Sequence, residues 1–206
     1  MPAPQTNHAG FEPKGSFAHV NLMVDSFIAN AEADDLRAIM RTMLASCPPS
    51  TASAFTAAAR KRFAQTSTRH PAPLPSAHYA LPTAGLAEAS PSLPATLRRA
   101  RALYGAGLGF AGLALLTSVA RGTLGLRWDL DGPLADTLAA VDADIAQALQ
   151  SCREEFGSGR VADVDAARAT LQELEATLIA SQDDTARWEG DFPFERALVD
   201  VQHWKL

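Results

Sequence analysis

The segment 102–120, ALYGAGLGFAGLALLTSVA, constrains the fold of this chain more than any other feature, because its nineteen residues carry no charge. Arginine residues flank it on both sides, at positions 98, 99 and 101 and at position 121. So apolar a segment has to be covered by lipid, by a bound cofactor or by other parts of the chain. We expect other helices of the chain to cover it, since glycine lets neighbouring backbones approach closely.

A membrane span over 102–120 is the first alternative. Nineteen helical residues extend for about 28 Å, slightly less than the roughly 30 Å hydrocarbon thickness of a bilayer. Gly105 and Gly109 also have the spacing at which small residues let membrane helices pack together. Four glycines and five alanines nevertheless leave the segment only marginally apolar, so we expect no membrane span.

A bound dinucleotide is the second alternative, because Gly107, Gly109 and Gly112 form a G-x-G-x-x-G sequence. In dinucleotide-binding folds such glycines follow a buried strand and open a helix that faces the pyrophosphate. The preceding residues 97–101, LRRAR, do not have the character of a buried strand, so we expect no cofactor. A related hypothesis is a small-ligand carrier, in which the glycine-lined side of the helix near 105–112 forms a cavity against later helices.

The composition is typical of a folded intracellular domain. The chain has 206 residues, of which 47% are hydrophobic and 20% are charged, as in globular proteins. Its two cysteines, Cys47 and Cys152, are too few for a disulfide framework, and we expect both to be reduced. The N-terminal residues lack the basic start and the apolar core of a secretory signal. We therefore expect an intracellular location, in the cytoplasm or the nucleus.

The formal net charge of −5 is divided unevenly along the chain. Residues 1–125 contain 11 basic and 6 acidic side chains, whereas residues 126–206 contain 7 basic and 17 acidic ones. The basic clusters at 60–62 and 98–101 could contact an acidic partner or a phosphate backbone. No sequence signature of a nucleic-acid-binding fold accompanies them, so we interpret both as solvated helix ends and expect no nucleic-acid partner.

After a disordered tail over 1–17, residues 18–65 are expected to form a small helical pair. Apolar residues recur at helical spacing over 36–44, the prolines at 48 and 49 end that helix, and a further helix follows. Such short helices offer too few apolar residues for a core of their own, so we expect them to need a partner surface. The candidate partner-binding residues are Leu36, Ile39, Met40, Met43, Phe55 and Phe63, and an ordinary intramolecular core is the alternative.

The rest of the chain is expected to form a proline-rich linker over 66–94 and a helical bundle over 95–206. The linker is predicted from six prolines and the absence of an apolar period. The bundle begins with a helix over 95–120. Apolar residues spaced by three and four predict two more helices joined by a short turn, which makes them antiparallel neighbours. The apolar seams of these helices include Leu134, Leu138, Val141, Ile145 and Phe156 in the first and Leu174 in the second. Large apolar side chains between positions 188 and 204 predict a last helix that docks on the bundle.

The segment 126–137, LRWDLDGPLADT, places Asp129 and Asp131 two residues apart. It resembles the first motif of the haloacid-dehalogenase-like phosphatases, an apolar strand followed by D-x-D-G-T-L. The resemblance implies that Asp129 is a phosphoryl-accepting nucleophile and Asp131 a general acid and base, and that both help to hold Mg²⁺. Pro133 stands where the family has threonine, and Arg127 interrupts the apolar strand. We interpret the segment as the loop before a helix, with the phosphotransfer enzyme as the alternative.

The sequence therefore predicts an all-α fold, with a C-terminal bundle of about four helices. Its five histidines are scattered and never occur at metal-binding spacing on a helix, and no local motif pairs a nucleophile with a base. We expect no catalytic, cofactor-binding or metal site. The function that these features favour is a non-enzymatic helical protein-interaction module, an adaptor or scaffold with a protein partner.

Overall fold

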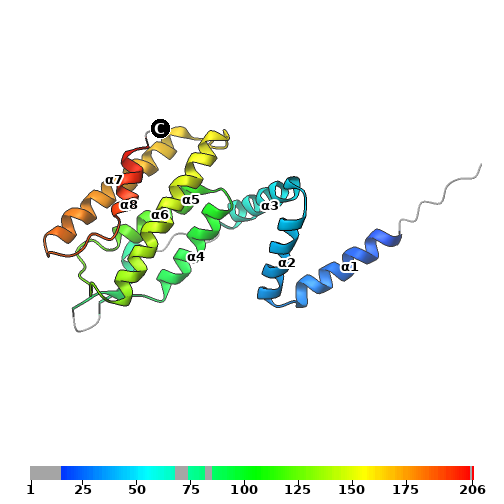
Figure 1. The fold of residues 1–206 in the computed structure, drawn as a ribbon, viewed down its shortest axis with the longest axis horizontal. Coiled ribbons are helices and arrows are strands. Elements are labelled where there is room, and N and C mark those ends of the chain that lie inside the picture. Colours follow the sequence, from blue (N-terminus) through cyan, green and yellow to red (C-terminus); the bar gives the residue numbers. More distant parts are fainter. Residues whose placement is uncertain (1–14, 68–73, 82–84, 205) are drawn as a thin grey trace, which may run out of the picture. The chain divides into compact units, whose positions relative to one another are not determined.

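The computed structural model describes residues 15–67, 74–81, 85–204 and 206, except for the side chains of 15–22 and 67. Eight α-helices run through these ranges, and the two strands among them have two residues each (Figure 1). Helical residues make up 73% of the residues that the structure describes, which confirms the all-α class. The chain separates into two units, Met1–Ser53 and Ala54–Leu206.

The first unit contains helices α1 (Gly15–Asn30) and α2 (Ala33–Ser46), and α3 (Pro49–Ser67) crosses into the second unit. Asp34 and Asp35 lie in the first turn of α2, where the helix dipole favours negative charge. The helix ends at Cys47, which takes an extended conformation because a proline follows it. The prolines at 48 and 49 follow the end of α2 as the sequence predicts, but residues 18–65 lie in three helices and not in the expected pair. The expected tail over 1–17 lies outside the described residues except where it enters α1.

The described part of the expected linker, 74–81 and 85–94, packs on the second unit and is not a free spacer there. It forms the 3₁₀ turn η1 (Pro75–His78) and the antiparallel strands β1 (Tyr79–Ala80) and β2 (Glu88–Ala89). The hydroxyls of Ser90 and Ser92 both donate hydrogen bonds of 2.6 Å to the carbonyl oxygen of Ala77. A few hydrogen bonds such as these hold the segment in place. They could not be predicted from its proline-rich composition.

The expected single helix over 95–120 is wrong, because the structure has two helices there, α4 (Ser92–Gly105) and α5 (Gly109–Arg121). The chain turns between them at Gly107, whose φ of +76° is a conformation that side chains rarely adopt. Apolar periodicity does not reveal this break, since the residues on both sides of it are apolar. The two helices pack against each other and both contact α6 (Pro133–Gly157) (Figure 1).

Helices α6, α7 (Val164–Ala186) and α8 (Glu195–Gln202) complete the bundle. The Asp163 side chain caps α7 by accepting a hydrogen bond of 2.9 Å from the backbone N–H of Ala166. The Asp142 carboxylate on α6 accepts one of 2.8 Å from the N–H of Ala197 and so ties the first turn of α8 to the bundle. The last helix docks on α6 and α7. Its buried residues are Ala197, Leu198 and Val201, and Phe194, directly before the helix, is buried as well.

None of the helices in the described ranges is both long enough and apolar enough to cross a membrane. The apolar run that suggested a span is divided between the end of α4 and α5. Leu113, Leu116 and Val119 of α5 are completely buried in the bundle core. Other helices of the chain therefore cover this segment, as its glycines and alanines predict.

Candidate functional site

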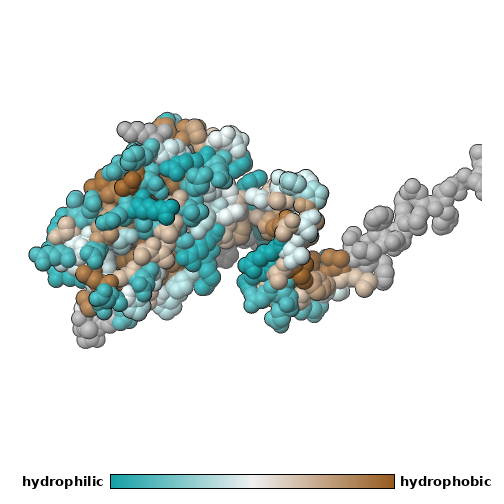
Figure 2. Space-filling model, in the orientation of Figure 1, coloured by the Kyte–Doolittle hydropathy of each residue, from teal (hydrophilic) through white to brown (hydrophobic). Residues whose placement is uncertain are grey.

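The apolar side chains exposed on α1 and α2 are the candidate interaction site, and we call them together the N-terminal apolar surface. It consists of Met23, Val24, Phe27, Ile28, Ile39 and Met43, whose exposed fractions lie between 38% and 63%. Figure 2 shows such apolar residues in brown over α1. No residue of α2 is buried. The bundle, by contrast, buries many of its large apolar side chains in a core.

The structure divides the predicted partner-binding residues into two groups. Leu36 and Met40 are half-buried beside the exposed Ile39 and Met43, and all four lie on α2. On α3, Phe55 is 41% exposed, whereas Phe63 packs against the bundle core. The α1 part of the surface was missed by sequence reasoning, although the spacing of its apolar residues at 23, 24, 27 and 28 is helical and gives a usable signal.

The two aspartates of the phosphatase-like segment lie in the loop between α5 and α6, and both are exposed. The Oδ1 atom of Asp129 accepts a hydrogen bond of 3.1 Å from the backbone N–H of Asp131. The residues directly before Asp129 form no strand. The strands that the structure describes are only β1 and β2, which lie earlier in the chain and pair antiparallel. The apolar strand that the phosphatase resemblance implies is therefore not formed, because the residues before Asp129 are loop.

Asp129 does line a cavity of about 470 Å³ between the β2 segment and the start of α6, which we call the Asp129 cavity. Sequence reasoning gave no sign of it, since its two walls come from positions at least forty residues apart. Its apolar lining is Leu86, Ala87, Ala89, Pro133 and Leu134, and its polar lining includes Glu88, Asp129 and Thr137.

The alternative hypothesis of a ligand cavity beside the glycine segment 105–112 finds no room at Gly109 and Gly112, because helix packing fills the space beside these two residues. A Cβ atom on Gly109 would overlap the backbone of Cys152 on α6, and one on Gly112 would lie 3.1 Å from the carbonyl oxygen of Ala100 on α4. Helix α4 precedes the G-x-G-x-x-G sequence, where a dinucleotide fold has a strand. Gly107 allows the turn between α4 and α5, and Gly109 and Gly112 allow close contacts between helices.

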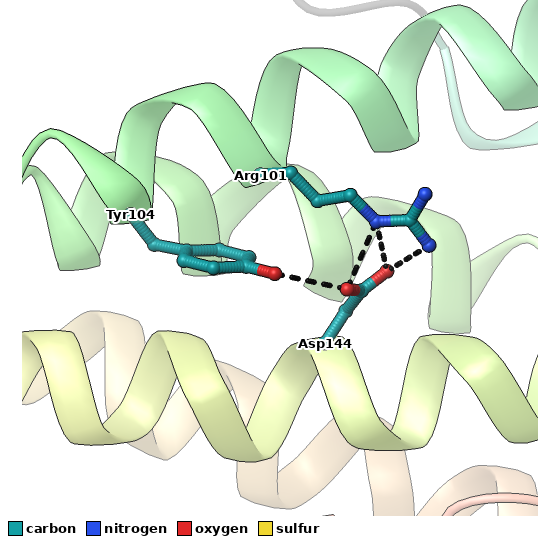
Figure 3. Close-up of polar contacts among 3 residues, drawn as sticks. All are labelled: Arg101, Tyr104 and Asp144. Carbon is teal, nitrogen blue, oxygen red and sulfur yellow. Dashed lines mark hydrogen bonds and ion pairs between the residues drawn. The ribbon is translucent and has the colours of Figure 1, made fainter. Parts of the chain in front are cut away.

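A polar cluster joins α4 to α6 (Figure 3). The Arg101 guanidinium donates to the Asp144 carboxylate through Nη2 at 2.7 Å and through Nε at 2.9 and 3.0 Å, and the Tyr104 hydroxyl donates at 3.0 Å. The hydrogen bond to Asp144 raises the pKa of Arg101, and burial together with that carboxylate raises the pKa of Tyr104 to about 12. Both donors therefore keep their protons at neutral pH, which makes the cluster a structural tie and not an acid–base pair.

No three His, Cys, Asp or Glu side chains gather at metal-binding distance within the described ranges. Burial raises the pKa of the Cys152 thiol, while Cys47 is half-exposed on the first unit. Comparisons of the chain with protein families, with curated proteins and with solved structures give no match. The candidate sites are therefore defined by geometry alone.

Proposed function

We propose that this chain is a helical protein-interaction module that binds a partner protein through the N-terminal apolar surface. One observation carries the proposal: α2 buries none of its residues, and the described side chains of α1 and α2 include six large apolar ones that are exposed. Helices of 14 and 16 residues are marginal in water unless an apolar face is covered. A partner that covers this surface would stabilise both helices.

The arrangement fits the mode in which an amphipathic helix inserts into an apolar groove of another protein. On α2 the apolar residues Leu36, Ile39, Met40 and Met43 recur at steps of three and four, which are the anchor spacings of that mode. Methionine adapts to irregular partner surfaces because its side chain is flexible and polarisable. The expected partner surface is therefore an apolar groove about four helical turns long.

Charge favours a protein groove over an anionic membrane surface. The described residues of the first unit carry four acidic side chains, Asp25, Glu32, Asp34 and Asp35, and two basic ones, Arg37 and Arg41. Helices that bind anionic lipid headgroups are rich in Lys and Arg on the polar face, and this unit has the opposite balance. A groove with a basic rim would be complementary to it.

The proposal is tested by comparing Met40→Asp with the matched control Ala45→Asp in the full chain. Both changes add one carboxylate to α2, but the exposed Ala45 lies on the side of the helix away from position 40. The partner that co-purifies with the unmodified chain is identified, purified and titrated against both variants. We expect Met40→Asp to weaken binding at least tenfold and Ala45→Asp to leave it nearly unchanged.

Thermal unfolding of the bundle serves as the folding control, because both substitutions lie outside the second unit. We expect both variants to melt at the same temperature as the unmodified chain. Equal binding by the two variants would contradict the proposal. So would loss of the bundle transition in Met40→Asp, since this residue would then belong to the folded core.

A further inference from the structure

The Asp129 cavity has the size and lining of a small-molecule site. Its volume of about 470 Å³ falls within the roughly 300–1,000 Å³ that ligand pockets occupy. Its inner wall contains Ala87 and Leu134, which are 3% and 5% exposed, so the cavity reaches the edge of the apolar core. Most of the side chains that line it are apolar, as in small-molecule pockets generally.

Local backbone contacts hold the two sides of this cavity in place. The N–H of Ala87 donates a hydrogen bond of 2.6 Å to the carbonyl oxygen of Arg127, which fixes the β2 segment against the loop before α6. On the other side, a Cβ atom on Gly132 would lie 2.9 Å from the Cβ of Asp129, so the turn there is tight. The small residues at 87, 89 and 132 leave the space open.

The charge of the cavity is negative. Glu88 and Asp129 contribute carboxylates to its lining, and neither forms an ion pair within the part of the chain that the structure describes. Asp131 adds a third acidic side chain on the loop before α6. The nearest basic residue in sequence, Arg127, does not line the cavity, and the partial positive charge of the α6 N-terminus is smaller than one carboxylate.

We propose that the Asp129 cavity binds an organic cation, a small molecule that combines an apolar body with an ammonium group. The apolar body covers Leu134 and the small residues of the inner wall, while the ammonium group lies between the carboxylates of Asp129 and Glu88. A carboxylate paired with a cation at a partly enclosed site forms a charge-assisted hydrogen bond, which is stronger than a neutral one. An anionic ligand of the same shape would be repelled.

The experiment titrates the full chain with three probes of one shape: 4-phenylbutylamine, 4-phenylbutanol and 4-phenylbutyrate. Binding is followed by the chemical shifts of backbone amides, which also report where each probe binds. We expect the amine to bind at least tenfold more tightly than the alcohol, the carboxylate to bind most weakly, and the shifts to cluster at Ala87 and Leu134. Equal affinities for the three probes, or shifts elsewhere in the chain, would overturn the proposal.

Two variants test whether the carboxylate of Asp129 is the one that binds the amine. Asp129→Asn keeps an oxygen that can accept the hydrogen bond from Asp131, so the loop is retained while the negative charge is lost. Asp136→Asn removes an exposed carboxylate from the first turn of α6, outside the lining of the cavity. We expect the first variant to bring the affinity for the amine close to that for the alcohol and the second to change it less than twofold. An equal loss of affinity for the amine in both variants would mean that the overall negative charge of the region attracts the amine. That result would overturn the proposed site.

Discussion

The backbone of Cys152 on α6 occupies the place where a side chain at position 109 on α5 would lie. A Cβ atom on Gly109 would also come within 2.7 Å of the carbonyl carbon of Ser151. Backbone cannot move aside as a flexible side chain can, so the two helices touch at this point only because residue 109 is glycine. The buried Cys152 and Leu149 of α6 lie around this contact.

Gly109→Ala is expected to destabilise the bundle by about 1–3 kcal/mol, because the added methyl group forces α5 and α6 apart. Gly105→Ala is the matched control, since no atom would lie within 4 Å of its Cβ and alanine favours helix more than glycine does. Urea unfolding measures both free energies. A Gly109→Ala variant as stable as the Gly105→Ala variant would show that the helices do not meet at this position.

The tie between Arg101 and Asp144 is expected to stabilise the bundle more than a surface ion pair does. Asp144 is 7% exposed and accepts hydrogen bonds from both Arg101 and Tyr104. A double-mutant cycle with Arg101→Met and Asp144→Asn should give a coupling free energy of about 1–2 kcal/mol. The control cycle uses Arg168 and Asp165, a pair whose acidic partner is 93% exposed, and should show no measurable coupling. Equal coupling in the two cycles would contradict the prediction.

His78 is expected to make the bundle less stable as the pH falls. The ring is completely buried, its Nδ1 has no hydrogen-bond partner among the described residues, and burial lowers its pKa below the usual 6.5. The folded state therefore favours the neutral ring. The bundle keeps its full unfolding free energy above about pH 6.5, where the ring is neutral in both states. At lower pH this free energy falls, because the unfolded chain binds as much as one proton more at His78 than the folded chain does.

Unfolding free energies of the unmodified chain and of His78→Asn, measured between about pH 5 and pH 8, test this pH dependence. We expect the variant to have the smaller loss of stability on acidification. His203→Asn is the control, because His203 is exposed, and it should keep the pH dependence of the unmodified chain. Parallel curves for the unmodified chain and His78→Asn would exclude the buried imidazole as the cause.

Phe194 is expected to anchor the last helix to the bundle. Its side chain is completely buried, and its ring meets that of Phe192 edge to face at 5.9 Å. Phe194→Ala should cost about 3–5 kcal/mol of unfolding free energy, from lost burial and the cavity that remains. Val199→Ala, at a position on α8 that is 54% exposed, should cost less than about 0.5 kcal/mol. A small effect of Phe194→Ala in thermal unfolding would mean that the tail contributes little.

The regular helices could be predicted because apolar residues recur in their sequences at helical spacing. On α6 the expected seam of Leu134, Leu138, Val141 and Ile145 is buried as predicted, and on α7 so is Leu174. The seam fails at its end, where Phe156 is 40% exposed. Periodicity shows which face of a helix is apolar but not how far its neighbours reach.

Contacts between distant positions were not predictable from one sequence. Arg101 and Asp144 are 43 positions apart, and Tyr79 donates its hydrogen bond of 2.9 Å to the carbonyl oxygen of Val119, 40 positions away. The Asp129 cavity has the same origin, since its walls meet only after the β2 segment folds onto α6. Neither composition nor spacing carries this information, because each partner looks like an ordinary surface or loop residue until the chain has folded.

The absence of buried residues on α2 has a practical consequence for anyone who studies a complex of this chain. Calorimetry measures the enthalpy that is absorbed when a packed core unfolds, and α2 has no buried residues. The melting curve will therefore report the unfolding of residues 54–206 and will not report that of α2. The arrival of a partner should instead be visible as slower proteolysis and slower amide hydrogen exchange across residues 23–46.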